Sequence, residues 1–401
     1  MTLSEELIWR GMIDQNTFGD PTELDKKPCK FYLGVDPSAD SLTIGNLAAL
    51  MMAKVFLRHG AAGILLVGGA TGQIGDPKFD KARDLKPADE IAHNAAAITT
   101  QLKQLFPENV KIVNNNDWLP KISFYDFMRN VGTYFSLTQL LDREFVKART
   151  GAGGSGLNVA EFCYSLLQGY DFLHLYQNFG VDLQLCGADQ MGNCISGVHL
   201  IKRAENARSD VWSTPLILDA NGKKFGKSEG NAVWLDAKKT SPFQFYQFWL
   251  NTDDAGVENY LKIYTELGKD EVDDIMTQQK ANPAAREAQK ALAFEATKIV
   301  HGAAAAESAR NVSRVLFGGA NLADLKPSEI DQLAGEIPTA KAGQTASQIL
   351  TKTGLAKSAS EARRLIAQNS ISLNGQKIAT DQIVGKTALL KKGKNSFVLV
   401  R

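Results

Sequence analysis

The stretch Phe31–Asn46, FYLGVDPSADSLTIGN, constrains the fold more than any other part of the chain. Its opening run, FYLGV, is apolar and β-forming, which indicates a buried parallel strand. Asp36–Pro37 ends this strand because proline has no N–H to donate to a sheet. Asp40 and Ser41 are good helix caps, and apolar residues recur at helical spacing after them. The free N–H groups at the start of such a helix predict an anion site, with Gly45 leaving room for a flat ligand or, alternatively, for close packing.

Further strands and helices alternate after this stretch. Apolar β-forming runs at Gly63–Gly69 and Val110–Trp118 predict two more strands, and the periodicity predicts helices near 86–106 and 160–179. Strands alternating with helices are typical of a parallel sheet that is covered on both faces and binds ligands at the carboxyl ends of its strands. The expected fold class is therefore α/β, with a Rossmann-like parallel sheet.

The chain beyond this sheet is predicted to hold two more structured parts. Amphipathic helices follow Ser241–Pro242, and the last sixty residues combine two helical stretches with a hairpin turn at Asn374–Gly375. The expected domains are 1–219, Rossmann-like and catalytic, with a helical insertion at about 119–159; 220–330, a lysine-rich loop and an α-helical domain; 331–343, a linker; and 344–401, a small α+β domain.

Charge is distributed unevenly along the chain. Residues 341–401 carry eleven Lys and Arg against two acids, a net +9, although the whole chain is only +1. A small basic module on an acidic body indicates a polyanion partner for that module, and a solubilising tail is the alternative. The segment is patterned and not of low complexity, which favours the partner. The residues expected to bind phosphates are Arg363, Arg364, Lys377, Lys391 and Lys392.

Several classes of protein are excluded by composition. The acidic, amphipathic start MTLSEELIWRG is not a signal peptide, and no stretch resembles a membrane span. The four cysteines form no CxxC pair and the five histidines form no cluster, so no metal centre is expected. Reduced core thiols and the lack of targeting signals predict a cytoplasmic protein.

Polar side chains recur on one face of the predicted helix at 160–179. Tyr164, Gln168 and Asp171 are spaced i, i+4 and i+7, so they share that face. Such a row is often only solvent-exposed surface, but an apolar run beginning at Asp182 carries a second polar set, Asp189 and Gln190, beside glycines. Together they predict the floor of a polar ligand pocket.

A lysine-rich loop follows at residues 222–228, GKKFGKS. Lys224, Lys227 and Ser228 lie around a glycine, which suits a polyphosphate whose charge must be neutralised. The spacing narrowly misses a Walker A loop, so a solvated basic hairpin tip is the alternative.

In combination these motifs resemble the bacterial tyrosyl-tRNA synthetases, which are class I aminoacyl-tRNA synthetases. The resemblance extends over essentially the full chain and rests on YLGVDPSADSLTIGN, GGATGQIGDP, NNNDW, EFCYSLLQGYDF, LQLCGADQMGN, KKFGKSEG, VWLD and KTSPFQFYQFWLNTDD. The basic tail is similar to the S4 RNA-binding domain of such enzymes. The implied reaction activates L-tyrosine with ATP and transfers it to the 3′ end of tRNA(Tyr).

The resemblance also implies a role for individual residues. Tyr32 and Asp171 correspond to the ligands of the phenol hydroxyl of tyrosine. The other implied tyrosine ligands are Asp76, Tyr164 and Gln168 at the α-ammonium, and Gln190 at the carboxyl. The implied ATP ligands are Gly34, Asp36, Ser38, Thr43, Gly45, Asn46, Asp189, Lys224, Lys227 and Ser228, of which Thr43, Asn46, Lys224 and Lys227 are expected to be catalytic. Mg²⁺ is expected to accompany ATP, and a homodimer is implied, with its interface near 119–150.

One motif departs from the family pattern. Thr43–Asn46 reads TIGN where the family has HIGH, so both histidines are replaced. Asn46 keeps an N–H donor, whereas the Thr43 hydroxyl is shorter than an imidazole and is never cationic. We expect a slower enzyme, and the alternative is a degenerate synthetase that binds tyrosine or RNA. A third interpretation, an amino-acid-activating enzyme without tRNA, conflicts with the basic tail.

Overall fold

The computed structural model describes residues 1–77, 84–107, 110–218, 227–228 and 231–401. These residues form two compact units. Met1–Thr240 and Thr252–Ala288 make the first unit, and Ser241–Asn251 and Gln289–Arg401 make the second. No helix in the described ranges is both long and apolar enough to span a membrane.

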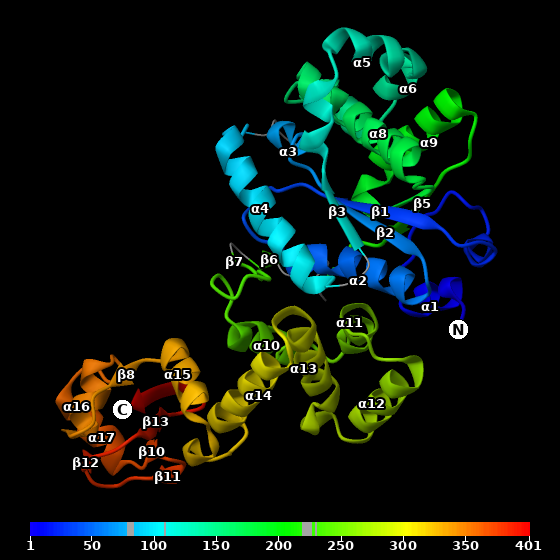
Figure 1. Cartoon of the computed structure of the whole chain (residues 1–401). Helices are drawn as coiled ribbons and strands as arrows, with labels where there is room; N and C mark the ends of the chain where they lie inside the picture. Colours follow the sequence, from blue (N-terminus) through cyan, green and yellow to red (C-terminus); the bar gives the residue numbers. More distant parts are fainter. Residues whose placement is uncertain (78–83, 108–109, 219–226, 229–230) are drawn as a thin grey trace. The chain divides into compact units, whose positions relative to one another are not determined.

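The first unit is built on a parallel sheet, which confirms the expected α/β fold class (Figure 1). The strand order is β3-β2-β1-β4-β5, so β1 lies in the middle and the chain leaves it in opposite directions on its two sides. This reversal is where doubly wound sheets bind ligands. The strands are β1 (Lys30–Val35), β2 (Ala62–Val67), β3 (Val110–Asn114), β4 (Leu183–Gly187) and β5 (Asp210–Thr214).

Helices cover both faces of this sheet. Consecutive strand residues point to opposite faces of the sheet. On one face the Phe31 ring packs on Phe56 of α2 (Ile44–Arg58), with ring centres 5.5 Å apart. On the other face the Tyr32 ring packs on Phe172 of α8 (Val159–Phe179), with ring centres 5.2 Å apart. The other helices of this unit are α1 (Leu3–Trp9), α3 (Thr71–Ile74), α4 (Ala88–Leu105), α5 (Phe124–Asn130), α6 (Leu137–Leu141), α7 (Glu144–Thr150), α9 (Met191–Glu205), α11 (Val257–Tyr264) and α12 (Lys269–Ala281).

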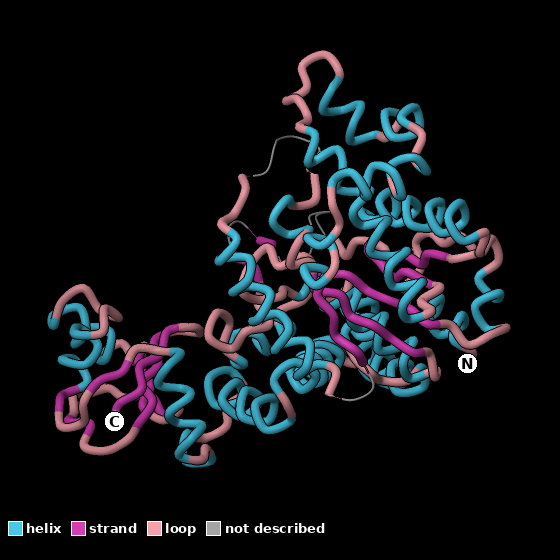
Figure 2. Tube along the Cα trace, turned by 45° about the horizontal axis from the view of Figure 1, so that its top comes forward, coloured by secondary structure: helices cyan, strands magenta, loops and turns pink. Residues whose placement is uncertain are grey.

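The second unit joins helices to a mostly antiparallel sheet; strands are magenta in Figure 2. The sheet order is β11-β10-β13-β14-β8. The helices are α10 (Pro242–Leu250), α13 (Glu287–His301), α14 (Ala303–Phe317), α15 (Pro327–Glu336), α16 (Ala346–Lys352) and α17 (Ala359–Ala367). The strands are β8 (Thr339–Ala340), β9 (Gln344–Thr345), β10 (Ile371–Leu373), β11 (Gln376–Lys377), β12 (Ile383–Val384), β13 (Ala388–Lys392) and β14 (Ser396–Val400).

The segment expected to be a linker, 331–343, is instead part of this second unit. Its first residues complete α15, where Leu333 is fully buried in one apolar cluster with Leu399. Its later residues form β8, which pairs in parallel with β14 through Leu399 and Thr339. The prediction of a linker was therefore wrong, because Gly335 lies within α15 while Pro338 and Gly343 lie between short packed elements.

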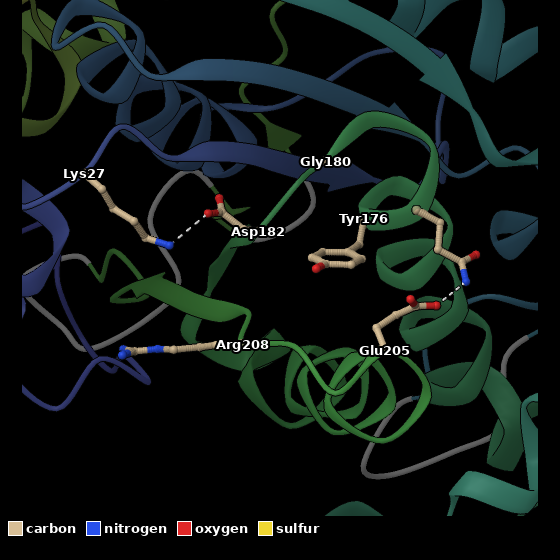
Figure 3. A pocket seen from close by; sticks show the side chains of 7 residues that line it. Lys27, Tyr176, Gly180, Asp182, Glu205 and Arg208 are labelled. Carbon is tan, nitrogen blue, oxygen red and sulfur yellow. Dashed lines mark hydrogen bonds and ion pairs between the residues drawn. The ribbon is translucent and has the colours of Figure 1, made fainter.

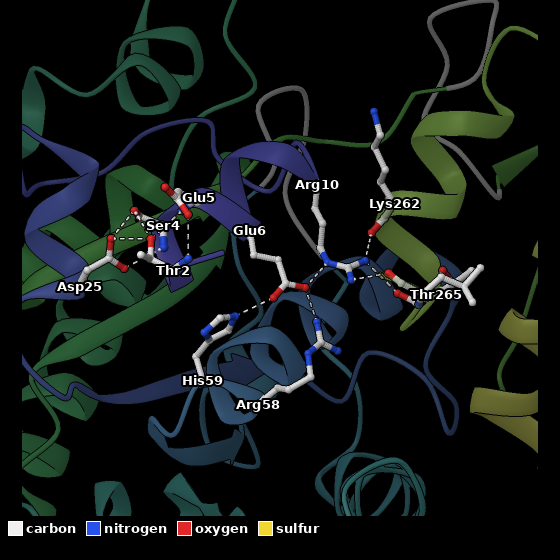
Figure 4. Close-up of polar contacts among 11 residues, drawn as sticks. Thr2, Ser4, Glu5, Glu6, Arg10, Asp25, Arg58, His59, Lys262 and Thr265 are labelled. Atoms are coloured by element: carbon white, nitrogen blue, oxygen red, sulfur yellow. Dashed lines mark hydrogen bonds and ion pairs between the residues drawn. The ribbon is translucent and has the colours of Figure 1, made fainter. Parts of the chain in front are cut away.

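A buried ionic network ties α1 to distant parts of the first unit (Figure 4). The Arg10 guanidinium is almost fully buried and donates to the carboxylate of Glu6 at 2.7 Å and to the carbonyls of Lys262, Thr265 and Leu267 at 2.6, 3.1 and 2.8 Å. Burial alone would raise the pKa of Glu6, but its hydrogen bonds from His59 and Arg10 hold that pKa at about 2. The arginine therefore satisfies the carbonyls at the end of α11.

Replacing Arg10 with methionine should lower the free energy of unfolding by about 3 kcal/mol, because it leaves buried acceptors without a donor. Urea denaturation followed by circular dichroism measures this change. Lys26→Gln is the control, since Lys26 pairs with Glu23 on the surface and should leave the midpoint unchanged. An unchanged midpoint for Arg10→Met would contradict the assigned role.

Candidate active site

Polar residues follow the ends of four neighbouring strands in the first unit. Asp36 comes directly after β1, Thr71 lies a short turn after β2, Asn115 directly follows β3, and Gln190 comes three residues after β4. Because the strands are parallel, these residues meet at one edge of the sheet. This is the edge at which the sequence predicts a ligand.

The carboxylate of Asp171 on α8 lies at the centre of the first cluster. It is buried and accepts hydrogen bonds from Asn115 Nδ2 at 2.9 Å and from Trp118 Nε1 at 2.7 Å. Burial, together with the charge of Asp36, raises the pKa of Asp171 to about 7 in spite of these two donors. A carboxylate so placed gains from an additional hydrogen-bond donor.

The charge of this carboxylate acts on the hydroxyl of Tyr32. The Tyr32 side chain is about 1% exposed, and its hydroxyl has no hydrogen-bond partner among the described residues. Burial raises its pKa well above the ordinary value, and the neighbouring Cys194 and Asp171 add to this shift. Because a buried hydroxyl without a partner costs about 1–3 kcal/mol, this position suits a ligand that brings its own hydroxyl.

A second cluster surrounds Asp36. Its two oxygens accept from Thr71 Oγ1 at 2.8 Å and from Tyr164 OH at 2.6 Å. Asn115 links the two clusters, since its Nδ2 also donates to Thr71 Oγ1 at 3.0 Å. The carboxylates of Asp171 and Asp36 are thus held at fixed positions by one chain of hydrogen bonds.

A third carboxylate, that of Asp76, lies beside the end of β4. Gln190 Nε2 donates to one of its oxygens at 2.7 Å and Asn193 Nδ2 to the other at 2.9 Å. Gln168, the middle residue of the polar face of α8, donates to Cys194 Sγ at 3.6 Å. The structure thus brings Asp76 together with Gln190, and Asp36 with Tyr164.

The residues expected at the nucleotide lie around the start of α2. Thr43 is the N-cap, and both its backbone N–H and its hydroxyl donate to Asn46 Oδ1 at 3.0 Å. A Cβ added to Gly45 would meet only Thr43 Oγ1 at 3.5 Å, and one added to Gly34 would meet only side chains at 3.8 Å or more. Both contacts are ordinary, so packing within the protein does not require glycine at either position.

Other expected nucleotide ligands are less fully described. Ser38 and Asp189 are exposed, the first after β1 and the second after β4. Lys224 lies outside the described residues. Lys227 and Ser228 are described only as the backbone of a short strand, β6 (Lys227–Ser228), which pairs with β7 (Asn231–Ala232).

The expected RNA-binding residues all lie in the second unit. Arg363 and Arg364 are exposed on α17, and Lys377 is exposed on β11. Lys391 donates to the Leu316 carbonyl at 3.2 Å and Lys392 to the Leu355 carbonyl at 2.5 Å. As neighbours on one strand these two lysines point to opposite faces, so they do not extend a single stripe.

A different depression lies at the opposite, amino-terminal edge of the parallel sheet (Figure 3). Its charged side chains are already engaged: Lys27 pairs with Asp182 at 3.3 Å, Arg208 with Asp210 at 3.0 Å, and Glu205 accepts from Gln177 at 2.6 Å. It is open and polar, and none of the expected site residues lines it.

Three residues of the site carry no role in the sequence analysis. Asn115, Trp118 and Thr71 hold the carboxylates of Asp171 and Asp36. Asn115 and Trp118 lie in the motif NNNDW, and Thr71 lies in GGATGQIG. Both motifs lie at the carboxyl ends of predicted strands, so their polar residues could have been expected at the ligand-binding edge of the sheet.

Comparisons with known proteins agree with this geometry. The family described as tRNA synthetases class I (W and Y) matches residues 24–318, and the SYY-like C-terminal domain of tyrosine--tRNA ligase matches residues 329–400. Tyrosine--tRNA ligases of Limosilactobacillus reuteri and Leuconostoc citreum are 41% and 42% identical, over all of this chain and 100% and 97% of theirs. A truncated mitochondrial tyrosyl-tRNA synthetase of Aspergillus nidulans is 31% identical with a TM-score of 0.72, over 79% of this chain and 94% of that one.

These matches confirm the resemblance found in the sequence and give no support to a degenerate synthetase. They cover both units of the chain. The chain belongs to the class I tRNA synthetases of the tryptophan and tyrosine group, and within it to the tyrosine--tRNA ligase family.

Proposed function

We propose that this protein is a tyrosine–tRNA ligase. A carboxylate oxygen of L-tyrosine attacks the α-phosphorus of ATP, the bond from that phosphorus to the bridging β-phosphate oxygen breaks, and pyrophosphate leaves. A ribose hydroxyl at the 3′ end of tRNA(Tyr) then attacks the tyrosyl carbonyl and releases AMP. Neither step uses a side-chain nucleophile, so the work of the protein is to position the reactants and stabilise charge.

The observation that carries the proposal is the buried Tyr32 hydroxyl, which has no partner among the described residues and whose pKa is raised in part by the charge of Asp171. A phenol hydroxyl bound between them would donate to Asp171 and accept from Tyr32, which satisfies both groups. Phenylalanine would leave the Tyr32 hydroxyl without a partner and would give Asp171 no donor beyond Asn115 and Trp118. Selection against phenylalanine therefore needs no editing, an effect for which tyrosyl-tRNA synthetases are themselves the standard example.

The polar groups further along the same edge suit the other end of tyrosine. The carboxylate of Asp76 can accept from the α-ammonium, assisted by Tyr164 and Gln168, and Gln190 can reach the carboxyl group. Asp36 and Tyr164 hydrogen bond to each other at 2.6 Å, which fixes the Tyr164 ring beside this position.

ATP is proposed to bind across Gly34, Gly45 and the first turn of α2. Asn46, Lys224 and Lys227 would face the phosphates, with the ribose near Asp189 and the turn at Ser38. Mg²⁺ is proposed to arrive with ATP and to be held mainly by its phosphates, because the nearby carboxylates of Asp36 and Asp76 already accept two side-chain donors each.

The second unit is proposed to bind tRNA in the manner of an S4 domain. Arg363, Arg364 and Lys377 are exposed, and Arg363 also pairs with Asp381 at 4.0 Å. Lys391 and Lys392 retain further N–H donors beside their carbonyl contacts. Neutralising Arg363 and Arg364 together should weaken aminoacylation and leave adenylate formation intact. Equal loss of both activities would contradict this assignment.

A homodimer is proposed through the insertion that precedes α8. Its helices expose large apolar side chains: Phe124 is 82% exposed, Tyr125 68% and Leu137 62%. Such a group of exposed side chains is typical of an interface. Phe124→Asp should shift the protein to a monomer in sedimentation experiments, and an unchanged dimer would exclude this surface.

The decisive experiment is ATP–pyrophosphate exchange with tyrosine, phenylalanine or tryptophan as the amino acid. We expect exchange with tyrosine and none above background with the other two. Exchange with tryptophan would instead indicate a tryptophan-activating enzyme of the same family. Absence of exchange together with measurable tyrosine binding would revive the degenerate alternative.

The pKa of Asp171 predicts a pH dependence. Because this pKa is raised to about 7, the carboxylate is protonated as the pH falls below 7 and no longer accepts the phenol hydrogen bond. The KM for tyrosine should therefore rise as the pH is lowered from 8 to 6. A KM for tyrosine that did not change with pH would contradict the prediction.

The raised pKa of Asp171 also affects stability. It stabilises the fold at low pH, and this contribution is lost as the pH rises through about 7.

A further inference from the structure

A segment far along the chain crosses the start of α2. The backbone N–H of Ile44 donates to the Val233 carbonyl at 3.1 Å, and that of Leu235 donates to the Leu42 carbonyl at 2.9 Å. Thr43 and Trp234 face each other between these bonds as an antiparallel bridge. Residues 233–236, here called the crossing segment, thus hold the backbone at the N-cap of the helix proposed to face ATP.

The crossing segment is itself anchored by side chains. The Asp236 N–H donates to Ser41 Oγ at 3.1 Å, and the Trp234 N–H donates to Thr240 Oγ1 at 3.0 Å. The ammonium of Lys239 forms an ion pair with Asp40 and lies 4.9 Å from the centre of the Trp234 ring. Lys239 therefore joins the turn before α2 to the crossing segment through two separate interactions.

This attachment is expected to affect the reaction, because the residues proposed to face ATP lie in the first turn of α2. A shift of about 1 Å in a positioned group can lower a reaction rate by roughly 100-fold. The bonds at Ile44 and Leu235 fix the backbone on both sides of Thr43, and Asn46 is one helical turn away. Anything that loosens the crossing segment should therefore move the groups that meet the phosphates.

We propose that Lys239, through Asp40 and Trp234, is a positioning residue for the nucleotide half of the site. It acts by holding the crossing segment against the start of α2 and not by touching a substrate. This inference rests on the proposed adenylation reaction. It assigns a role to three residues that lie outside every expected site.

The test compares Lys239→Gln with Lys54→Gln. Lys54 lies on α2, pairs with Glu266 at 3.0 Å and sits 5.4 Å from the centre of the Phe106 ring. It therefore makes one ion pair and one cation–π contact, as Lys239 does. In tyrosine-dependent exchange, Lys239→Gln should lower kcat about five- to tenfold with the KM for tyrosine unchanged, a size expected for one ion pair and one cation–π contact. Lys54→Gln should match the wild type. Equal behaviour of the two variants would overturn the proposal.

Charge reversal separates positioning from direct contact. In Asp40→Lys/Lys239→Asp the ion pair is restored with its charges exchanged but the cation–π contact with Trp234 is lost, so part of the lost rate should return. A double variant no faster than Lys239→Gln would mean that this pair does not hold the crossing segment, and the proposal would be wrong.

A second readout does not depend on activity. Hydrogen–deuterium exchange of the backbone at 42–47 should be faster in Lys239→Gln than in Lys54→Gln. Unchanged exchange there would overturn this inference even if the wild type proved inactive, an outcome that would refute the proposed function separately.

Discussion

Replacing Asp171 with asparagine should raise the KM for tyrosine about 100-fold, which corresponds to roughly 3 kcal/mol for a hydrogen bond to a charged group. Asparagine keeps the shape of the side chain but has a single acceptor oxygen, and that oxygen is needed by Trp118 or Asn115. The phenol of the substrate would then face an N–H group in place of an acceptor. Steady-state exchange kinetics at pH 8, where Asp171 is ionised, measure the effect.

The matched control is Asp210→Asn. Asp210 is also a buried carboxylate, and it accepts from Thr17 and Arg208 at the opposite end of the sheet. Its replacement should reduce stability and leave the KM for tyrosine unchanged. The role of Asp171 would be refuted if both variants had the same KM.

The helix that carries Asp171 illustrates which features of the site could be predicted from the sequence. Its helix, its face and its neighbours Tyr164 and Gln168 follow from helical periodicity, and the observed α8 at Val159–Phe179 confirms the predicted helix at 160–179. The strand and helix start of Phe31–Asn46 are likewise confirmed by β1 and α2. Local pattern was sufficient here because each element has its own periodicity and caps.

The partners of these residues could not be obtained in the same way. Asn115 lies 56 positions from Asp171, and Thr71 lies 35 positions from Asp36, so their hydrogen bonds depend on strand order. Periodicity does not report which strands are neighbours. The edge strand β5 was also missed, since its five residues, DVWST, are all buried and show no alternation.

Boundaries between units were the weakest prediction for a similar reason. Proline, glycine and alanine around 331–343 suggest a linker when the chain is read locally. In the structure this segment pairs with β14, which lies close to the end of the chain. The chain also enters the second unit at Ser241–Asn251, leaves it, and returns at Gln289, an interleaving that composition does not reveal.

The second large effect is expected at Asn46. Its Oδ1 accepts from the Thr43 N–H, which can only donate, so the amide nitrogen is directed away from that bond and remains a donor for phosphate. Asn46→Asp keeps the acceptor but replaces the donor with a negative charge. We expect kcat for exchange to fall about 100-fold, as for loss of one transition-state donor. Thermal stability should not fall, because a carboxylate near a helix N-terminus is favourable.

Thr43 should act through the same group. Its hydroxyl donates to Asn46 Oδ1, so Thr43→Val should lower kcat about fivefold, the value of one neutral hydrogen bond of roughly 1 kcal/mol. In an Asn46→Ala background the Thr43→Val change should then have no further effect, since there is no amide left to orient. Exchange rates of the wild type, both single variants and the double variant measure this coupling. Full additivity would instead mean that the Thr43 hydroxyl meets the nucleotide directly, as the first histidine of the HIGH motif is expected to do.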